Sequence, residues 1–267
     1  LFYILVIYLQ YNIFTMKNTL ILSFLLIFSI NLSATKCTHT DDYEVRYITE
    51  DMQLNNQIQE NLRNQYAWQE FISTYSNWFT YFNEYNYKPH RAFGSPINLG
   101  QGSTLENKFQ SFIYNDLLVF DIPSNLVLDR RTKNEKYINL DYKQYYNNLE
   151  VIDSRLYAKF NLQNQLIAFG LDVFSDISIS INPSITGNDA IQSASQNITS
   201  PTFNTSVEDD LKILPIPKNG KYNYHLVYSV RVSTKLTHGP ANYICYVDAN
   251  SGELLMRINS VFYEAPP

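Results

Sequence analysis

The sequence predicts an α+β protein of two related modules, each a capped helix packed on an antiparallel sheet, preceded by a signal peptide. Two observations lead to this fold class. Two amphipathic segments begin with helix-capping residues, and each is followed by segments in which apolar and polar residues alternate. A third observation is that 267 residues with 45% hydrophobic and 15% aromatic side chains are enough to form a substantial core.

The N-terminal part predicts an export signal at residues 16–34. A short positive region around Lys17 is followed by the apolar run Thr19–Ile30 and by small residues that end at Ala34, where we expect cleavage. The apolar run is short for a membrane span, and a transmembrane anchor is the alternative. Residues 1–15 precede Met16 and are interpreted as upstream reading frame, with a second membrane segment as the alternative. The mature protein is expected to be secreted or periplasmic, without a stable membrane span.

Residues 35–100 are expected to form a helix followed by a hairpin. In "YAWQEFISTYSNWFTYF", aromatic and apolar side chains recur near helical spacing, so we expect a helix to about Tyr75. After it, a hairpin is expected to turn around Glu84–Lys88, with Pro89 opening the return strand.

Residues 101–180 form the first predicted module. Its helix is expected to begin with a capping box of Ser103 and Glu106. The apolar stripe of this helix predicts a buried face, made of Leu105, Phe109, Phe112, Ile113 and Leu117. The segment Tyr137–Phe174 then predicts antiparallel strands, with a turn at "NLQNQ".

Residues 181–267 form the second predicted module, with Ile181–Gly187 as the linker. Thr186 and Asp189 predict a capping box for its helix, whose apolar stripe is Ala190, Ile191, Ala194 and Ile198. Asn219-Gly220 is a strong signal for a two-residue hairpin turn. The next strand alternates, which predicts one covered face and one partly solvated face; the covered side is expected to carry Tyr222, Tyr224, Leu226, Tyr228, Val230 and Val232.

The stretch Asp248–Glu253, "DANSGE", could be a calcium loop or a turn. Counted from Asp248, the glycine falls one place early for an EF-hand, and the twelfth position is Asn259 instead of Glu. Alternating segments flank it on both sides, where an EF-hand has helices. Asp and Asn accept backbone bonds in turns and Gly permits positive φ, so the sequence predicts a hairpin turn.

No residue pattern indicates a catalytic, cofactor-binding or metal site. The four histidines, His39, His90, His225 and His238, form no His-Glu-x-x-His motif, and there is no Gly-x-Ser-x-Gly or phosphate loop. The acidic run Glu208–Asp210 is expected to be a solvated turn. The net charge of −5 gives no basic footprint, which argues against nucleic acid as a partner.

The two cysteines, Cys37 and Cys245, leave two possibilities open. An exported chain could oxidise them to a disulfide, but residues so far apart in sequence could equally remain free thiols. Lys36 occupies the place where a lipoprotein would carry a small residue before the cysteine. Two cysteines with no neighbouring histidine pattern give no metal-ligand spacing.

Several motifs resemble the fungalysin/thermolysin propeptide (FTP) module followed by a PepSY-type module. Gln144, Tyr146 and Val151 match the pattern Gln-x-Tyr-x-Gly-x-Pro-Val, with Asn148 and Glu150 in place of Gly and Pro. The helix opening "INPSITGNDAIQSA" and the hairpin "KPHRAFGSPI" are similar to their counterparts in that family. The C-terminal stretch resembles the end of the PepSY module, Val-Asp-Ala-x-Thr/Ser-Gly-Glu-x-Leu; the matching residues are Val247, Asp248, Ala249, Ser251, Gly252, Glu253 and Leu255.

The resemblance implies a non-catalytic prosegment, which acts as intramolecular chaperone and inhibitor of an exported zinc metallopeptidase. Its partner would be the catalytic domain, in cis or in trans. The sequence stops at Tyr263–Pro267, so we expect either a truncated reading frame or modules that stand alone. The rival hypothesis is a free-standing exported binding or inhibitor module that captures its partner on an exposed sheet face or edge.

Overall fold

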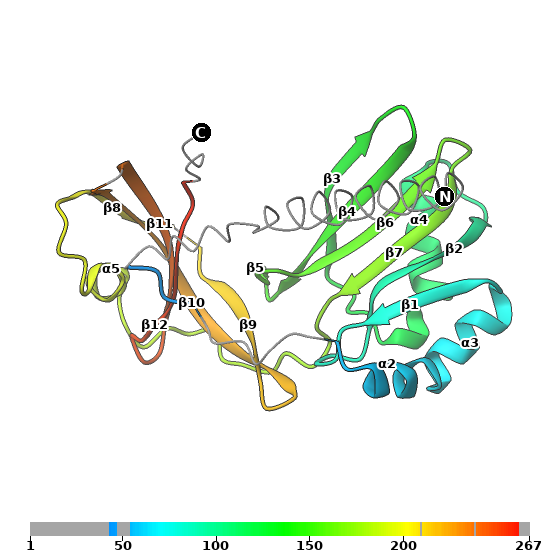
Figure 1. Cartoon of the computed structure of the whole chain (residues 1–267), viewed down its shortest axis with the longest axis horizontal. Coiled ribbons are helices and arrows are strands. Elements are labelled where there is room, and N and C mark those ends of the chain that lie inside the picture. Colours follow the sequence, from blue (N-terminus) through cyan, green and yellow to red (C-terminus); the bar gives the residue numbers. More distant parts are fainter. Residues whose placement is uncertain (1–42, 47–53, 209, 238, 262–267) are drawn as a thin grey trace, which may run out of the picture. The chain divides into compact units, whose positions relative to one another are not determined.

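The computed structural model describes residues 43–46, 54–208, 210–237 and 239–261. Within this part the chain is α+β, as predicted, with two antiparallel sheets (Figure 1). The segments predicted as upstream frame, 1–15, and signal peptide, 16–34, lie outside the described residues.

The first sheet has the strand order β1-β2-β7-β6-β4-β3, and every pairing is antiparallel. A short strand, β5, pairs with the end of β4. The strands are β1 (Trp78–Phe82), β2 (Pro89–Asn98), β3 (Leu126–Lys133), β4 (Tyr137–Tyr146), β5 (Leu149–Glu150), β6 (Arg155–Asn161) and β7 (Gln165–Asp172). Because β1 and β2 belong to this sheet, the boundary expected near residue 100 does not separate two sheets.

Helices cover one face of the first sheet and form its core. They are α2 (Asn56–Arg63), α3 (Tyr66–Thr74), α4 (Leu105–Asn115) and the 3-10 turn η1 (Leu118–Phe120). The predicted stripe is buried throughout, but its last member, Leu117, lies beyond the end of α4, next to η1. Phe109 packs edge-on against Phe160 of β6, and Phe71 of α3 packs against Phe169 of β7, with ring centroids 5.6 and 5.4 Å apart. Apolar burial therefore fixes the helices on this face.

The helix cap expected at Ser103 is wrong by one residue. Thr104 is the N-cap of α4, and its hydroxyl accepts a hydrogen bond from the amide of Asn107 at 3.1 Å. A Thr at this position satisfies a free amide as well as Ser does, so two adjacent capping residues made the register ambiguous in sequence. The predicted helix before Tyr75 and the hairpin that returns at Pro89 are confirmed as α3, β1 and β2.

The second sheet has the order β12-β11-β10-β8, with β9 paired to the first half of the long β10. Its strands are β8 (Thr202–Val207), β9 (Lys212–Lys218), β10 (Lys221–Leu236), β11 (Gly239–Asp248) and β12 (Leu254–Asn259). Helix α5 (Gly187–Ser195) packs on one face, and its capping box of Thr186 and Asp189 is confirmed. Asn219 and Gly220 have φ of 55° and 73°, as the predicted two-residue hairpin turn requires.

The second face of β10 is more covered than the sequence predicted. Val227 and Ser229, on the side expected to be partly solvated, are almost fully buried. Val227 packs in a cluster with Leu214, Leu255 and Ile152, which comes from the first module. The prediction failed here because alternation along one strand does not show what a neighbouring module adds to its polar face.

The two sheets meet through residues that follow β5 and β7. Val151 forms a parallel bridge with Ile213 of β9, and the amide of Ile152 donates to the carbonyl of Ile213 at 2.8 Å. Phe174 packs with Val151 and Ile213, and its ring lies 4.8 Å from that of Tyr222. The two sheets are therefore joined by packed apolar side chains, in addition to the covalent connection along the chain.

Candidate functional site

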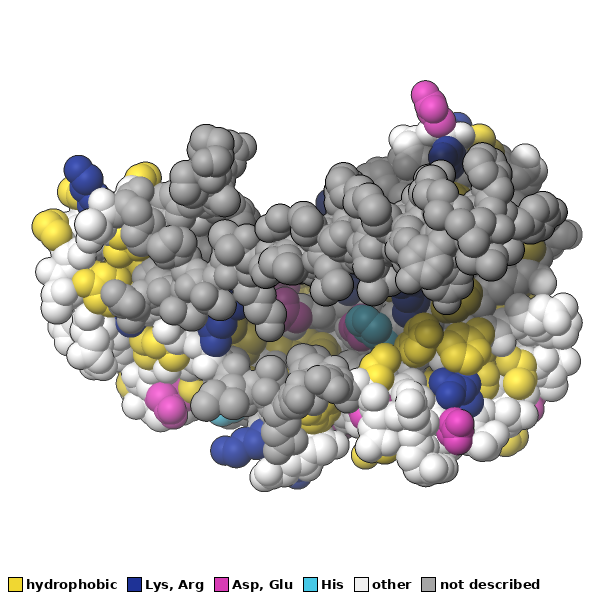
Figure 2. All heavy atoms as spheres, in the orientation of Figure 1, with side chains coloured by type: hydrophobic (Ala, Val, Ile, Leu, Met, Phe, Trp, Pro, Cys, Tyr) yellow, Lys and Arg dark blue, Asp and Glu magenta, His cyan; other side chains and the backbone are white. Residues whose placement is uncertain are grey.

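The face of the first sheet opposite the helices carries exposed aromatic side chains. Phe79, Tyr81 and Phe93 are each about two-fifths exposed, at 39%, 40% and 40%. They are neighbours because Phe79 pairs with Phe93 and Tyr81 pairs with Arg91 across β1 and β2. Figure 2 shows hydrophobic side chains gathered over β1, with basic side chains near them.

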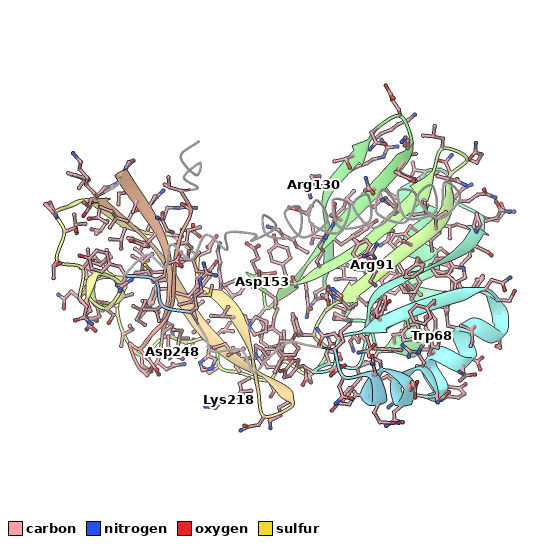
Figure 3. The ribbon with its side chains drawn as sticks, viewed as in Figure 1. Trp68, Arg91, Arg130, Asp153, Lys218 and Asp248 are labelled. Atoms are coloured by element: carbon pink, nitrogen blue, oxygen red, sulfur yellow. The ribbon has the colours of Figure 1, made fainter. Side chains whose placement is uncertain are left out.

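Four basic side chains lie over aromatic rings on and beside this face. The cation-to-centroid distances are 4.9 Å for Arg63 over Phe79, 5.9 Å for Arg91 over Phe93, 4.8 Å for Arg155 over Tyr157 and 4.3 Å for Lys159 over Tyr137. We call these four pairs the cation–aromatic face; Figure 3 labels Arg91 on it and Trp68 among the helices. Aromatic residues and Arg are enriched in protein interfaces, so the composition fits a protein-binding surface.

Gly170 makes part of this face possible. A Cβ atom placed there would lie 2.1 Å from the ring of Tyr157 and 2.3 Å from the carbonyl oxygen of His90. Any other residue at this position would have to displace the Tyr157 ring and the backbone of β2. The ring in turn supports the guanidinium of Arg155.

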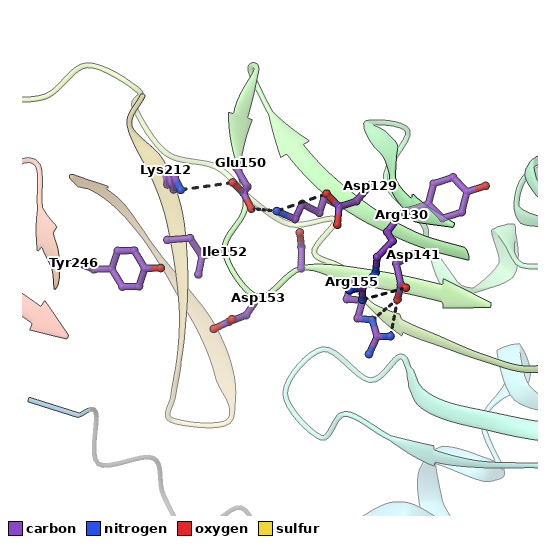
Figure 4. Close-up of a pocket in the computed structure, with 12 residues that line it drawn as sticks. Asp129, Arg130, Asp141, Glu150, Ile152, Asp153, Arg155, Lys212 and Tyr246 are labelled. Atoms are coloured by element: carbon purple, nitrogen blue, oxygen red, sulfur yellow. Dashed lines mark hydrogen bonds and ion pairs between the residues drawn. The ribbon is translucent and has the colours of Figure 1, made fainter. Parts of the chain in front are cut away.

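An open pocket of about 420 Å³ lies next to this face, where the first sheet approaches β9 and β11 (Figure 4). Its lining is mainly charged, with four acidic and four basic side chains, to which the ring of Tyr246 and the apolar side chain of Ile152 add one wall. Burial, followed by the charge of Asp153, raises the pKa of Tyr246 to about 12, so the phenol is neutral near pH 7.

Ion pairs occupy most of the charged groups in the pocket. Arg155 donates to Asp141 at 2.7 Å, and Arg130 lies 3.5 Å from the same carboxylate. Lys143 donates to Glu150 at 2.8 Å, and this bond raises the pKa of the lysine. Lys212 lies 3.6 Å from Glu150.

Asp153 differs from the other acidic groups of the pocket. Among the described residues it has neither a hydrogen bond nor an ion pair from its carboxylate. Its backbone is left-handed, with φ of 58°. The residue is solvent-exposed, but surrounding atoms partly desolvate its side chain, which raises its pKa above the ordinary value. The sequence analysis missed this residue, because Asp153 and Tyr246 come to line one pocket only when the two sheets pack together.

The stretch Asp248–Glu253 is a turn, as predicted. It joins β11 to β12, and the carboxylate of Asp248 accepts hydrogen bonds from the amides of Asn250 and Ser251, both at 2.8 Å. The other carboxylate oxygen lies 2.8 Å from Nδ1 of His225. Gly252 has φ of 74°. The acidic and amide side chains here are used by the turn itself.

The histidines are not brought together. His90 pairs with Asp172 at 2.8 Å on the exposed side of the first sheet, whereas His225 pairs with Asp248 in the second sheet. His39 and His238 lie outside the described residues. Within the described ranges, no group of three or more His, Cys, Asp and Glu side chains is placed to hold a metal ion.

Cys245 is fully buried under α5, and Cys37 lies outside the described residues. Burial raises the pKa of the Cys245 thiol to about 12, with a smaller opposing effect from Arg257. A thiol with this pKa stays protonated near neutral pH and is a poor nucleophile. The acidic run expected as a turn contains Glu208, whose pKa is lowered by the hydrogen bond from Lys212 at 2.8 Å.

Of the helices in the described part, none has the length and apolar character to cross a membrane. No protein-family model and no curated protein matches the sequence. Among solved structures, the chain is similar to the C-terminal domain of YpeB from Bacillus megaterium. The identity is 10% and the TM-score 0.33, and the alignment covers 77% of this chain and 97% of that domain.

Proposed function

We propose that this chain is a non-catalytic protein-binding module that holds its partner on the cation–aromatic face. In finer terms, we propose that it is the prosegment of an exported zinc metallopeptidase, which it helps to fold and then inhibits. The observation that carries the proposal is the face itself. An antiparallel sheet covered by helices on one side presents exposed Phe and Tyr rings, paired with Arg and Lys, on the other.

Three places in the family pattern, two that match it and one that departs from it, support the finer proposal by their positions in the fold. Asn148, where the family pattern has Gly, has φ of 67°, a conformation that Gly and Asn adopt readily. Val151, at the end of that pattern, is the residue that bridges to the second sheet. The stretch Val247–Leu255 forms the closing hairpin that underlies the resemblance to the PepSY module.

The cation–aromatic face belongs to a module with its own core, so it could serve as a template on which the peptidase domain folds. Contacts between distant segments form slowly, because the chain entropy lost on closure precedes the gain from the contact. A module with its own aromatic core can offer a rigid face on which such a partner condenses. Inhibition needs only that the same module obstructs the cleft of the folded peptidase.

The test is refolding of the peptidase domain encoded next to this segment, identified by His-Glu-x-x-His codons. Added in trans, the full chain should raise the yield of active enzyme and then slow its hydrolysis of casein. The chain alone should not hydrolyse casein. Chelator-sensitive hydrolysis by the pure chain would contradict the non-catalytic assignment.

Charge reversal tests the face directly. Arg91→Glu replaces a cation by a carboxylate beside the electron-rich face of Phe93 and should weaken both rescue and inhibition, because it removes a cation–aromatic pair. Tyr66→Ser is the matched control, since Tyr66 is 73% exposed and lies on α3, away from the face. Equal rescue by both variants would remove the face from the mechanism. If no peptidase domain responds to the chain, the free-standing binding module becomes the better account.

A further inference from the structure

We propose that the charged pocket between the first sheet and β9 binds a basic side chain of the partner polypeptide, a lysine or arginine whose cation pairs with Asp153. The proposal rests on the proposed function in one respect: a polypeptide partner supplies the side chain. Its evidence is separate, because it comes from the charges of the pocket and not from the cation–aromatic face.

The first step is the charge inventory of the pocket. Asp141 is held by Arg155 and Arg130, Glu150 by Lys143 and Lys212, and Asp129 lies 3.8 Å from Lys143. Every basic group of the pocket is thus engaged by an acid. Asp153 is the acidic group that no described basic side chain engages.

The second step is the rigidity of the segment that carries Asp153. Val151 and Ile152, which precede it, are anchored to Ile213 by the bridge and the amide bond described above. Ser154, which follows, is buried; its hydroxyl donates to the carbonyl of Val151 at 2.6 Å and accepts from the amide of Gln144 at 2.9 Å. The backbone on both sides of Asp153 is therefore fixed before any ligand binds.

The third step is the chemistry of the wall beside this carboxylate. Ile152 and the ring of Tyr246 offer apolar surface for an alkyl chain, and the neutral phenol can accept a hydrogen bond from an ammonium or guanidinium group. Among the charges that act on the phenol, those of Asp153, Glu208 and Glu150 are negative and that of Arg231 is positive, and the effect of Asp153 is the largest. A lysine or arginine side chain combines an apolar stem with a terminal cation.

Two other ligand classes fit less well. A divalent metal ion needs several oxygen ligands, and the other carboxylates of the pocket already serve ion pairs. An anion would have to displace a carboxylate from Arg155, Lys143 or Lys212. The free carboxylate therefore points to a single organic cation.

The experiment is an NMR titration of the 15N-labelled full chain with the blocked tripeptide acetyl-Ala-Lys-Ala-amide. The neutral counterpart, with norleucine in place of lysine, has the same stem without the charge. We expect the lysine peptide to shift the amide signals of Ile152–Arg155 and to bind about tenfold more tightly than the norleucine peptide. Asp153→Asn should abolish this preference, because Asn accepts the same positive φ but carries no charge.

Asp121→Asn is the matched control. Asp121 is also an aspartate in the left-handed region, with φ of 54°, and it does not line the pocket. This variant should bind the lysine peptide like the wild type. If Asp153→Asn does not fold, Asp153→Gly preserves the same backbone conformation and replaces it.

Several outcomes would overturn the proposal. They are an unchanged preference in Asp153→Asn, equal binding of the norleucine peptide, no shift at Ile152–Arg155 with the lysine peptide, and an equal shift with Mg²⁺ or Ca²⁺ alone. Because the assay contains no peptidase, its failure is distinguishable from failure of the refolding test.

Discussion

At the scale of single residues, left-handed backbone positions fix many turns of this protein. Nine described residues other than glycine have positive φ, and eight of these are Asn or Asp. These residues tolerate positive φ better than other L-residues, because a short polar side chain can bond to the local backbone. Asn and Asp at such positions are a sequence signal for turns, and this signal made several hairpins recognisable.

Gly252→Val should destabilise the protein by about 1 kcal/mol or more, because a β-branched residue resists the φ of 74° found there. Urea unfolding monitored by circular dichroism measures the change. Gly252→Asn is the matched control and should cost less, since Asn tolerates the left-handed region. Equal losses in the two variants would show that lost space, and not φ, decides the effect.

Calcium should leave the melting temperature unchanged. The carboxylate oxygens of Asp248 already bond to two backbone amides and to His225, so they are not free to bind an ion. Differential scanning calorimetry with millimolar calcium, and with EDTA as the control, checks this. A large rise in melting temperature with calcium would restore the metal-loop interpretation of this stretch.

His90 should make the stability depend on pH. The hydrogen bond to Asp172 raises the pKa of His90 above its usual value of about 6.5, and partial burial opposes it. A raised folded-state pKa means that the stabilisation is complete below about pH 6.5 and is lost as pH rises through the folded-state pKa. The stability difference between the wild type and His90→Gln should therefore shrink between pH 6 and pH 9. A difference that grows with pH in urea titrations would refute the assignment.

At the scale of elements, the amphipathic helices carry the cores. Phe112→Ala in α4 should cost about 3–5 kcal/mol, because the ring is only 4% exposed and packs against Phe109 and Tyr75. Tyr114→Ala, two residues further along α4 on its exposed side and 41% exposed, should cost far less. Chemical denaturation of both variants gives the comparison; similar losses would mean that α4 does not pack as described.

Local sequence patterns predicted those helices and turns that depend only on residues close together in the sequence. The α4 stripe, the Asn219-Gly220 hairpin and the capping box of Thr186 all depend on residues close in sequence, so period and turn chemistry were sufficient. Strand β3 was missed, since almost all of its side chains are exposed and alternation gives no signal. Helix α2 was missed as well; Gln59, which reaches the end of β1 and bonds to Phe82, is buried on it.

The candidate site could not be predicted in the same way. In the sequence Asp153 cannot be told from the other aspartates that form turns. Its position in the same pocket as Tyr246 depends on how the two sheets pack together. Two of the cation–aromatic pairs also join different elements: Arg63 of α2 reaches Phe79 of β1, and Lys159 of β6 reaches Tyr137 of β4. The sequence does not show how these elements are placed. Contacts between distant segments were therefore the part that sequence patterns left open.

At the scale of the whole described chain, the two sheets should unfold as one cooperative unit. Ile213 is fully buried in contact with Val151, and Asn83, which follows β1 of the first sheet, donates to the hydroxyl of Tyr222 at 2.9 Å. The hydroxyl of Tyr224 also donates to Asp176 beyond the end of β7. Separating the modules would expose this apolar cluster and break its polar bonds, which couples the stability of one sheet to that of the other.

The two tryptophans of the chain make this coupling measurable. Trp68 and Trp78 both lie in the first core, so their fluorescence reports the first sheet alone, whereas far-UV circular dichroism reports both sheets. In the wild type the two urea transitions should coincide. In Ile213→Asp they should separate, with circular dichroism changing first, because a charge buried without a partner costs several kcal/mol at the junction. Val232→Ala, within the core under α5, is the control: it should shift both transitions together by about 1–3 kcal/mol. Coincident transitions in Ile213→Asp, or separate ones in the wild type, would show that the sheets are stable independently of the junction.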